Sequence, residues 1–268
     1  MSRTLVLYEA LRTADSAYWS PFGDSARDAI RLLNALGLTQ LRYLLLAILD
    51  VYPKGLNLTA AKSRKAKTDA VGWLAAWGIR GVVTGRTGVK QAETAYLEAA
   101  AAVRAGKATT VADIRKIFVA AGRTATDPEF KADFARASLN ATATKVAMYA
   151  LETHLLGKDA PMGPKPKLTR EHVLPQNPDE NSGAWKHFSA QTHADFVERL
   201  GNTLLLTGIT NSSLRNKSWA EKKSLIRKKG VKQLPLTEEA LLEPKWTKSV
   251  IEKRQRRMAD LAIAVWRG

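Results

Sequence analysis

The residue best suited to acid–base chemistry is a histidine in the C-terminal half of the chain. His172 ends a short run of apolar and polar residues, and two asparagines, Asn202 and Asn211, follow it. A neutral imidazole, with an ordinary pKa of about 6.5, can accept a proton from water at physiological pH. His172 is therefore a candidate general base for hydrolysis. A single histidine is equally compatible with a hydrogen-bonded strand residue, so the surrounding elements must decide its role.

Three short elements must position these side chains. Leu168–Pro175 mixes apolar and polar residues before a proline, which is typical of a strand that ends in a turn. Gly201–Gly208 encloses a leucine run between glycines and predicts a second, buried strand. Ser218 and Glu221 have the spacing at which each side chain caps a backbone N–H of the other. A helix should therefore begin there and end at Gly230.

The segment after the second predicted strand is strongly basic. The chain has 42 Lys and Arg against 25 Asp and Glu, a formal net charge of +17. Between Leu214 and Lys232 the single acid is Glu221, and the basic residues are Arg215, Lys217, Lys222, Lys223, Arg227, Lys228, Lys229 and Lys232. Clustered positive charge favours a polyanionic partner, because each neutralised phosphate of a nucleic acid releases condensed counterions. The simpler alternative is a basic surface that only keeps the protein soluble.

The order of these pieces resembles the HNH nucleases of the ββα-metal type, in particular the C-terminal nuclease domain of GmrSD-type restriction enzymes and related phosphorothioation-linked anti-phage nucleases. A strand with histidine, a strand with asparagine and a basic helix follow one another in the family's order. The matching positions are Glu171-His-Val-Leu-Pro-Gln176, Leu200-Gly-Asn-Thr-Leu-Leu-Leu206, Asn211, Asn216, Trp219 and Lys222. Each piece is common by itself, but together, in this order, they are fairly specific.

The resemblance implies a metal-dependent DNA endonuclease with a role for each matching residue. His172 would be the general base, and Glu171 and Asn211 would hold Mg²⁺, with Mn²⁺ as a possible substitute. Asn202 would orient the histidine or tie the two strands together. Glu171 is the weaker metal ligand, because neighbouring residues of a strand point to opposite faces. The residues expected to contact DNA are Arg215, Asn216, Lys217, Lys222 and Lys223.

Other features bound the class of protein. Cysteine is absent, which excludes disulfides, thiol catalysis and a zinc–cysteine site. No apolar run approaches the roughly 20 residues that span a bilayer, and the N-terminus lacks the apolar region of a signal peptide, so we expect a cytoplasmic protein. Gly81–Gly88 lacks the spacing of a phosphate-binding glycine loop, and we interpret it as a connection between helices.

The predicted fold is mainly α. Residues 1–157 should form an α-helical domain, because apolar residues recur at steps of three and four. Residues 158–167 are rich in Pro and Gly and read as a linker. Residues 168–268 should form a small ββα-metal domain that ends in two helices, Leu236–Leu242 and Val250–Trp266.

These expectations favour the cutting component of a restriction or anti-phage system, which would nick duplex DNA because it offers one His and one metal site. A separate or missing nucleotide-dependent sensor module would be its protein partner, since no such signature occurs in the sequence. Two alternatives remain open at this point. The chain could be a basic adaptor that binds nucleic acid without cutting it, or an HNH nuclease directed at RNA.

Overall fold

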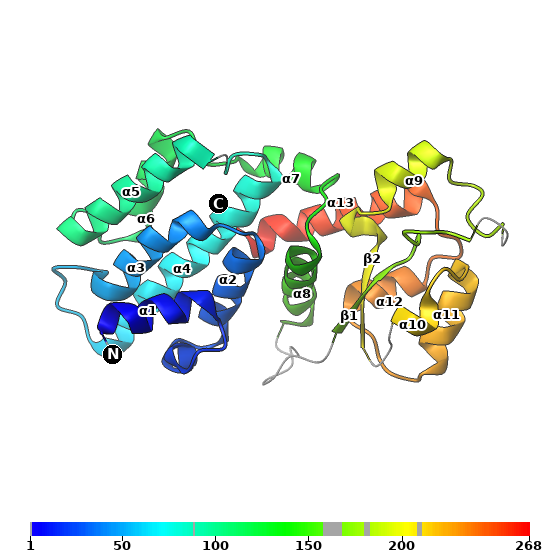
Figure 1. Cartoon of the computed structure of the whole chain (residues 1–268), viewed down its shortest axis with the longest axis horizontal. Coiled ribbons are helices and arrows are strands. Elements are labelled where there is room, and N and C mark those ends of the chain that lie inside the picture. The colour runs from blue at the N-terminus through cyan, green and yellow to red at the C-terminus, as the bar shows by residue number, and fades with distance from the viewer. Residues whose placement is uncertain (1, 88, 158–167, 180–182, 208–210) are drawn as a thin grey trace. The chain divides into compact units, whose positions relative to one another are not determined.

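The fold is mainly α-helical, with one two-stranded sheet in the part of the chain that is described (Figure 1). The structure is a computed structural model, and it describes residues 2–87, 89–157, 168–179, 183–207 and 211–268. The chain divides into two compact units. Unit 1 comprises Met1–Phe130 together with Trp266–Gly268, and unit 2 comprises Lys131–Val265.

Unit 1 is a helical assembly around an apolar core. Its helices are α1 (Arg3–Arg12), α2 (Asp24–Ala35), α3 (Arg42–Val51), α4 (Ala60–Val83), α5 (Val89–Ala105) and α6 (Val111–Ala120), and α7 (Asp127–Phe134) begins in this unit. Helix α6 begins with a capping box in which Thr110 and Asp113 cap each other's backbone. Trp77 and Phe118 pack edge to face with ring centroids 4.8 Å apart. This aromatic contact joins α4 and α6 within the core.

Helix α4 extends further than the sequence predicted. Gly81 was expected in a connection between helices, but α4 continues through it to Val83. The chain then turns back, and Arg86 N donates to Gly81 O at 2.7 Å. A Cβ at position 81 would lie 2.7 Å from Thr87 Cγ2, closer than side-chain atoms can approach. The glycine is therefore needed because the returning chain packs against the helix.

Unit 2 contains the sheet and the helices around it. They are α8 (Ala141–Leu156), β1 (Leu168–His172), α9 (Ala190–Phe196), β2 (Thr203–Thr207), α10 (Asn211–Leu214), α11 (Trp219–Lys228), α12 (Pro235–Leu241) and α13 (Lys248–Val265). The strands are antiparallel, and Leu168 pairs with Thr207 while His172 pairs with Thr203. Leu204, Leu205 and Leu206 are completely buried, which explains why this strand is a continuous leucine run rather than an alternating pattern.

The local signals in this region predicted the elements well. Both strands lie where the sequence placed them, and α11 begins after a capping box formed by Ser218 and Glu221. Gly230 follows α11 with a φ of 63°, a left-handed conformation that glycine adopts without strain. Trp219 is 5% exposed and belongs to the core. Among the described residues, none of the helices has the length and apolar character needed to cross a membrane.

The division into units differs from the predicted domain boundary at residues 158–167. Helix α8 was assigned to the first domain, but the structure groups it with the sheet. Glu152 Oε2, on α8, accepts a hydrogen bond from Leu236 N at 2.9 Å, and Gln255 Nε2 donates to Phe134 O and Ala137 O. These buried polar contacts join α8 and the chain before it to α12 and α13. The predicted linker itself lies outside the described residues.

Candidate active site

His172 lies at the end of β1 beside an open pocket of about 360 Å³. Its side chain is 10% exposed, so most of the ring is covered while one edge reaches the pocket. The lining residues are Glu171, His172, Pro175, Gln176, Asn177, Arg215 and Asn216. The strand end, the turn after it and the segment before α11 therefore meet here. Of the residues predicted to act in the site, the structure brings Glu171, His172, Arg215 and Asn216 together.

A glutamate that sequence reasoning did not single out contacts the histidine. His172 Nε2 lies 3.2 Å from Glu198 Oε2, and Gln176 Nε2 donates to Glu198 Oε1 at 2.6 Å. Glu198 follows α9 and is 26 residues from His172 in the chain. No local pattern marks such a contact, because it depends on how α9 returns to the end of β1. Gln176 was noted only as part of the motif.

The surroundings keep the imidazole of His172 neutral. Burial lowers its pKa, and the positive charge of Arg170 lowers it further, against the opposing effect of Glu198. For Glu198, burial raises the pKa, but the hydrogen bond from Gln176 and the interactions with His172 outweigh this and lower it overall. At physiological pH the ring is therefore neutral and the neighbouring carboxylate is charged. A neutral ring can accept a proton.

Glu171 forms a buried ion pair with Lys222. Lys222 Nζ donates to Glu171 Oε1 at 2.6 Å, and also to His172 O at 2.8 Å and Val173 O at 3.1 Å. The two side chains are 6% and 1% exposed. Burial raises the pKa of Glu171, and the charge of Lys222 opposes this shift. Three acceptors around Nζ match the three N–H groups of an ammonium, so we assign the charged form to the lysine.

This ion pair corrects one prediction. Lys222 was expected to reach a phosphate of DNA, but it points into the protein and its three donors are used. Its neighbour Lys223 is half-buried and donates to Glu243 O at 2.9 Å. The basic character of the segment did not reveal this, because the acceptors of Lys222 lie about fifty positions away in the sequence. Lys222 instead fixes the chain at the end of β1.

Asn202 is a structural link rather than a group that touches substrate. It is completely buried, and its Nδ2 donates to Leu174 O at 2.9 Å and to Val197 O at 2.8 Å. Its Oδ1 accepts from Leu174 N at 2.8 Å and from Trp246 Nε1 at 2.9 Å. These four bonds use the full capacity of the amide. Of the two roles expected for Asn202, orienting the histidine or tying the strands together, these bonds match the second.

The remaining predicted residues differ in how much the structure says of them. Asn211 begins α10, and its side chain lies outside the described part of the chain. Arg215, Asn216 and Lys217 are exposed, and the first two line the pocket. Arg215 has a φ of 38°, an uncommon conformation for a residue with a side chain. These exposed polar groups remain candidates for contact with a phosphate backbone.

One residue with the oxygen donors that a hard divalent cation prefers lines the pocket beside His172. It is Glu171, whose Oε1 accepts a hydrogen bond from Lys222 Nζ. Within the described residues, no group of three or more His, Asp or Glu side chains gathers where it could hold a metal.

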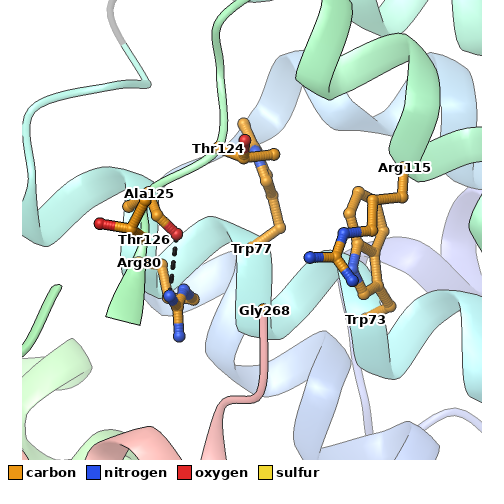
Figure 2. A pocket seen from close by; sticks show the side chains of 8 residues that line it. All are labelled: Trp73, Trp77, Arg80, Arg115, Thr124, Ala125, Thr126 and Gly268. Atoms are coloured by element: carbon orange, nitrogen blue, oxygen red, sulfur yellow. Dashed lines mark hydrogen bonds between the residues drawn. The ribbon is translucent and has the colours of Figure 1, made fainter. Parts of the chain in front are cut away.

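A second pocket, in unit 1, does not have the groups needed for chemistry. Figure 2 shows it, and its volume is about 130 Å³. The lining residues are Trp73, Trp77, Arg80, Arg115, Thr124, Ala125, Thr126 and Gly268. This lining contains no His, Asp, Glu or Lys that could exchange a proton near neutral pH. The guanidinium of Arg80 also bonds to Ala125 O and to Asp127 Oδ1, so its charge is paired.

Residues 124–261 match the family described as GmrSD restriction endonucleases, C-terminal domain. The match covers about half of the chain and includes His172, Glu198, Asn202 and Lys222. The matched range also includes α7 and α8, and nearly all of it lies in unit 2. A search of curated proteins found no match.

Proposed function

We propose that this chain, which belongs to the family of GmrSD restriction endonuclease C-terminal domains, is a nuclease whose active site is the His172 pocket. The observation that carries the proposal is the neutral, mostly buried imidazole that reaches an open pocket inside the matched segment. His187 and His193 also line pockets within the matched segment, but the Nε2 of each bonds to a backbone carbonyl, that of Trp246 and that of Pro175. A surface histidine without this setting would not support the same proposal.

The reaction we propose is hydrolysis of a phosphodiester bond. His172 would take a proton from the attacking water, and Arg215 and Asn216 at the pocket would bind phosphate oxygens. A divalent cation, held by Glu171 and Asn211, would neutralise charge that develops on the phosphoryl group. Lys222 would keep Glu171 and the end of β1 in place through its three hydrogen bonds. The order β1, β2 and α11 supports the ββα-metal arrangement implied by the resemblance.

We propose duplex DNA as the substrate and a restriction or anti-phage system as the context. The net charge of +17 and the exposed Lys228 and Lys229 at the end of α11 suit a polyanionic backbone. One general base can activate one attacking water at a time, so a single chain should nick rather than cut both strands. A sensor module on another chain or segment would then decide when and where cutting occurs.

A plasmid assay tests the function directly. The purified protein should convert supercoiled plasmid to the open-circular form with magnesium or manganese, and EDTA should stop the reaction. His172→Ala should lower the rate by about 10²- to 10⁴-fold, the usual contribution of a general base. His154→Ala is the matched control, because His154 is exposed on α8 and does not line the pocket.

The outcomes separate the proposal from its alternatives. Full cleavage by His172→Ala would exclude the proposed active site. If the parent protein bound plasmid but cleaved nothing with any of several divalent metals, the non-catalytic adaptor would be the better reading. Cleavage of RNA in preference to the plasmid would instead identify an RNA-directed enzyme. Circular dichroism of each variant would confirm that loss of activity is not loss of folding.

A further inference from the structure

We propose that Glu198 is a positioning residue for His172, whose carboxylate holds the Nε2–H tautomer and leaves Nδ1 free to take the proton from water. The inference rests on the proposed function, because it assigns a role within the same site. A neutral imidazole has one N–H donor and one acceptor nitrogen, and a hydrogen bond to one nitrogen decides which is which. The contact between Nε2 and Glu198 Oε2, at 3.2 Å, is such a bond.

The carboxylate of Glu198 is itself held in place. Its Oε2 faces His172, and its Oε1 accepts from Gln176 Nε2 at 2.6 Å. Gln176 lies four positions after His172 and lines the same pocket. The glutamate is therefore bound from two points on the segment that carries the base. A carboxylate fixed at both oxygens keeps a histidine oriented better than one that is free to rotate.

Asn202 fixes the distance between the two segments. Its Nδ2 binds Leu174 O, two residues after His172, and Val197 O, one residue before Glu198. The same amide also accepts from Leu174 N through Oδ1. A buried, fully bonded amide thus connects the backbone next to the base to the backbone next to the carboxylate. This link holds the two side chains at contact distance before any substrate binds.

Glu198 acts through the histidine rather than on the substrate. Its side chain is 44% exposed, but it is absent from the lining of the pocket that His172 and Gln176 share. Among the described residues no hydrogen bond to Nδ1 is found, so that nitrogen has its lone pair available for water.

Three variants test the proposal. Glu198→Ala should lower kcat on the order of 10- to 100-fold, as loss of an orienting partner does, while the Kd for DNA changes little. Glu198→Gln keeps an acceptor for Nε2–H and should recover part of the loss. Asp195→Ala is the matched control, because it removes the same charge three positions earlier without touching His172. A charge effect alone would move the Asp195 and Glu198 variants equally.

Nitrogen NMR of the histidine-labelled protein gives a readout that does not require activity. The spectrum of His172, assigned by its disappearance in His172→Ala, should show the Nε2–H tautomer in the parent and a mixture in Glu198→Ala. An Nδ1–H tautomer in the parent would overturn the proposal even if the plasmid assay succeeded. Unchanged kcat in Glu198→Ala, or a change confined to Kd, would also overturn it. If the parent were inactive, the proposed function would fail, and the NMR result would still decide the tautomer.

Discussion

A buried arginine of unit 1 and a buried lysine of unit 2 each donate to the same set of acceptor types. Arg80 on α4 and Lys222 on α11 are 3% and 1% exposed, and each donates to one carboxylate and two backbone carbonyls. The acceptors are Asp127, Ala125 and Trp266 for the arginine, and Glu171, His172 and Val173 for the lysine. A count of hydrogen bonds would therefore treat the two as equivalent.

Arg80 and Lys222 differ in the environment of their carboxylate partners and in the residues that supply the backbone carbonyls. Asp127 is 58% exposed, so water solvates it whether or not Arg80 is present. Glu171 is 6% exposed, so Lys222 supplies most of its stabilisation. The carbonyl acceptors of Lys222 are also the backbone of the candidate base and its neighbour. A buried cation therefore bears on function when its partner depends on it and when both lie at the site.

The largest expected effect follows from removing Lys222. Lys222→Met should lower the free energy of unfolding by about 3–5 kcal/mol, because a buried Glu171 charge loses its partner. Cleavage should be lost as well, since the end of β1 would no longer be held. Urea denaturation followed by circular dichroism measures the first effect, and the plasmid assay measures the second.

A double variant separates the two consequences. Glu171→Gln with Lys222→Met removes both charges, so most of the stability should return while cleavage stays low. Full stability of the single Lys222→Met variant would contradict the buried ion pair. Recovery of cleavage in the double variant would show that neither side chain is needed at the site.

Unit 2 also holds a buried carboxylate that has no ion-pair partner among the described residues. Glu152 is completely buried, and burial raises its pKa from 4.5 to about 7, against the opposing effects of a hydrogen bond from Leu236 N and the charge of Arg254. Between pH 4.5 and about 7, Glu152 therefore keeps its proton in the folded state and has lost it in the unfolded state. This contribution to stability is complete below pH 4.5 and is lost as the pH rises to about 7.

Replacing that carboxyl group with an amide should remove this dependence. Glu152→Gln should be more stable than the parent above pH 7, by at most about 3 kcal/mol, and should show a flatter profile between pH 4.5 and 7. Thermal unfolding at a series of pH values measures the difference. If both proteins changed in parallel, Glu152 would be charged in the folded state across the range.

The local parts of the fold could be predicted from the sequence, and the non-local parts could not. Ser218 and Glu221, three positions apart, cap the start of a helix, and the leucine run of β2 predicts a buried strand. The start of unit 2 could not be predicted in this way. It depends on Gln255 binding the carbonyls of Phe134 and Ala137, more than a hundred positions away.

The same limit applies to the candidate site. His172 was found because its residue type and its motif are visible in the sequence, and the structure places it at a pocket. Glu198 was missed because an isolated glutamate after a helix has no pattern of its own. Lys222 was expected to contact DNA because it lies in the basic segment and matches the family pattern, and the acid that keeps it inside lies on another element.

A smaller loss of stability is expected when Arg80, the buried arginine of unit 1, is replaced. Arg80→Met should lower the free energy of unfolding by about 2 kcal/mol, because three hydrogen bonds are lost but Asp127 remains solvated. Cleavage by the folded protein should be unchanged. Hydrogen exchange monitored by mass spectrometry should show faster exchange in α4. A loss as large as that of Lys222→Met would remove the distinction between the two cations.

The smallest effect on stability is expected for lysines on the same helix as Lys222 that face solvent. Lys228 and Lys229 are exposed at the C-terminal end of α11, so replacing both with Ala should change the free energy of unfolding by less than about 0.5 kcal/mol. Binding should respond instead. The slope of log K against log salt for duplex DNA should fall by about 0.9 for each phosphate contact that is lost.

Salt titrations on two unrelated duplexes distinguish the uses of charge on this helix. The Lys228 and Lys229 double variant should lose affinity equally on both duplexes, because phosphate contacts carry no sequence information. Lys253→Ala is the matched control, since Lys253 is exposed but paired with Glu243 at 3.1 Å. A slope that stayed at the parent value would mean that DNA approaches another face. Loss on one duplex alone would mean that these lysines contact bases, and α11 would then contribute specificity as well as charge.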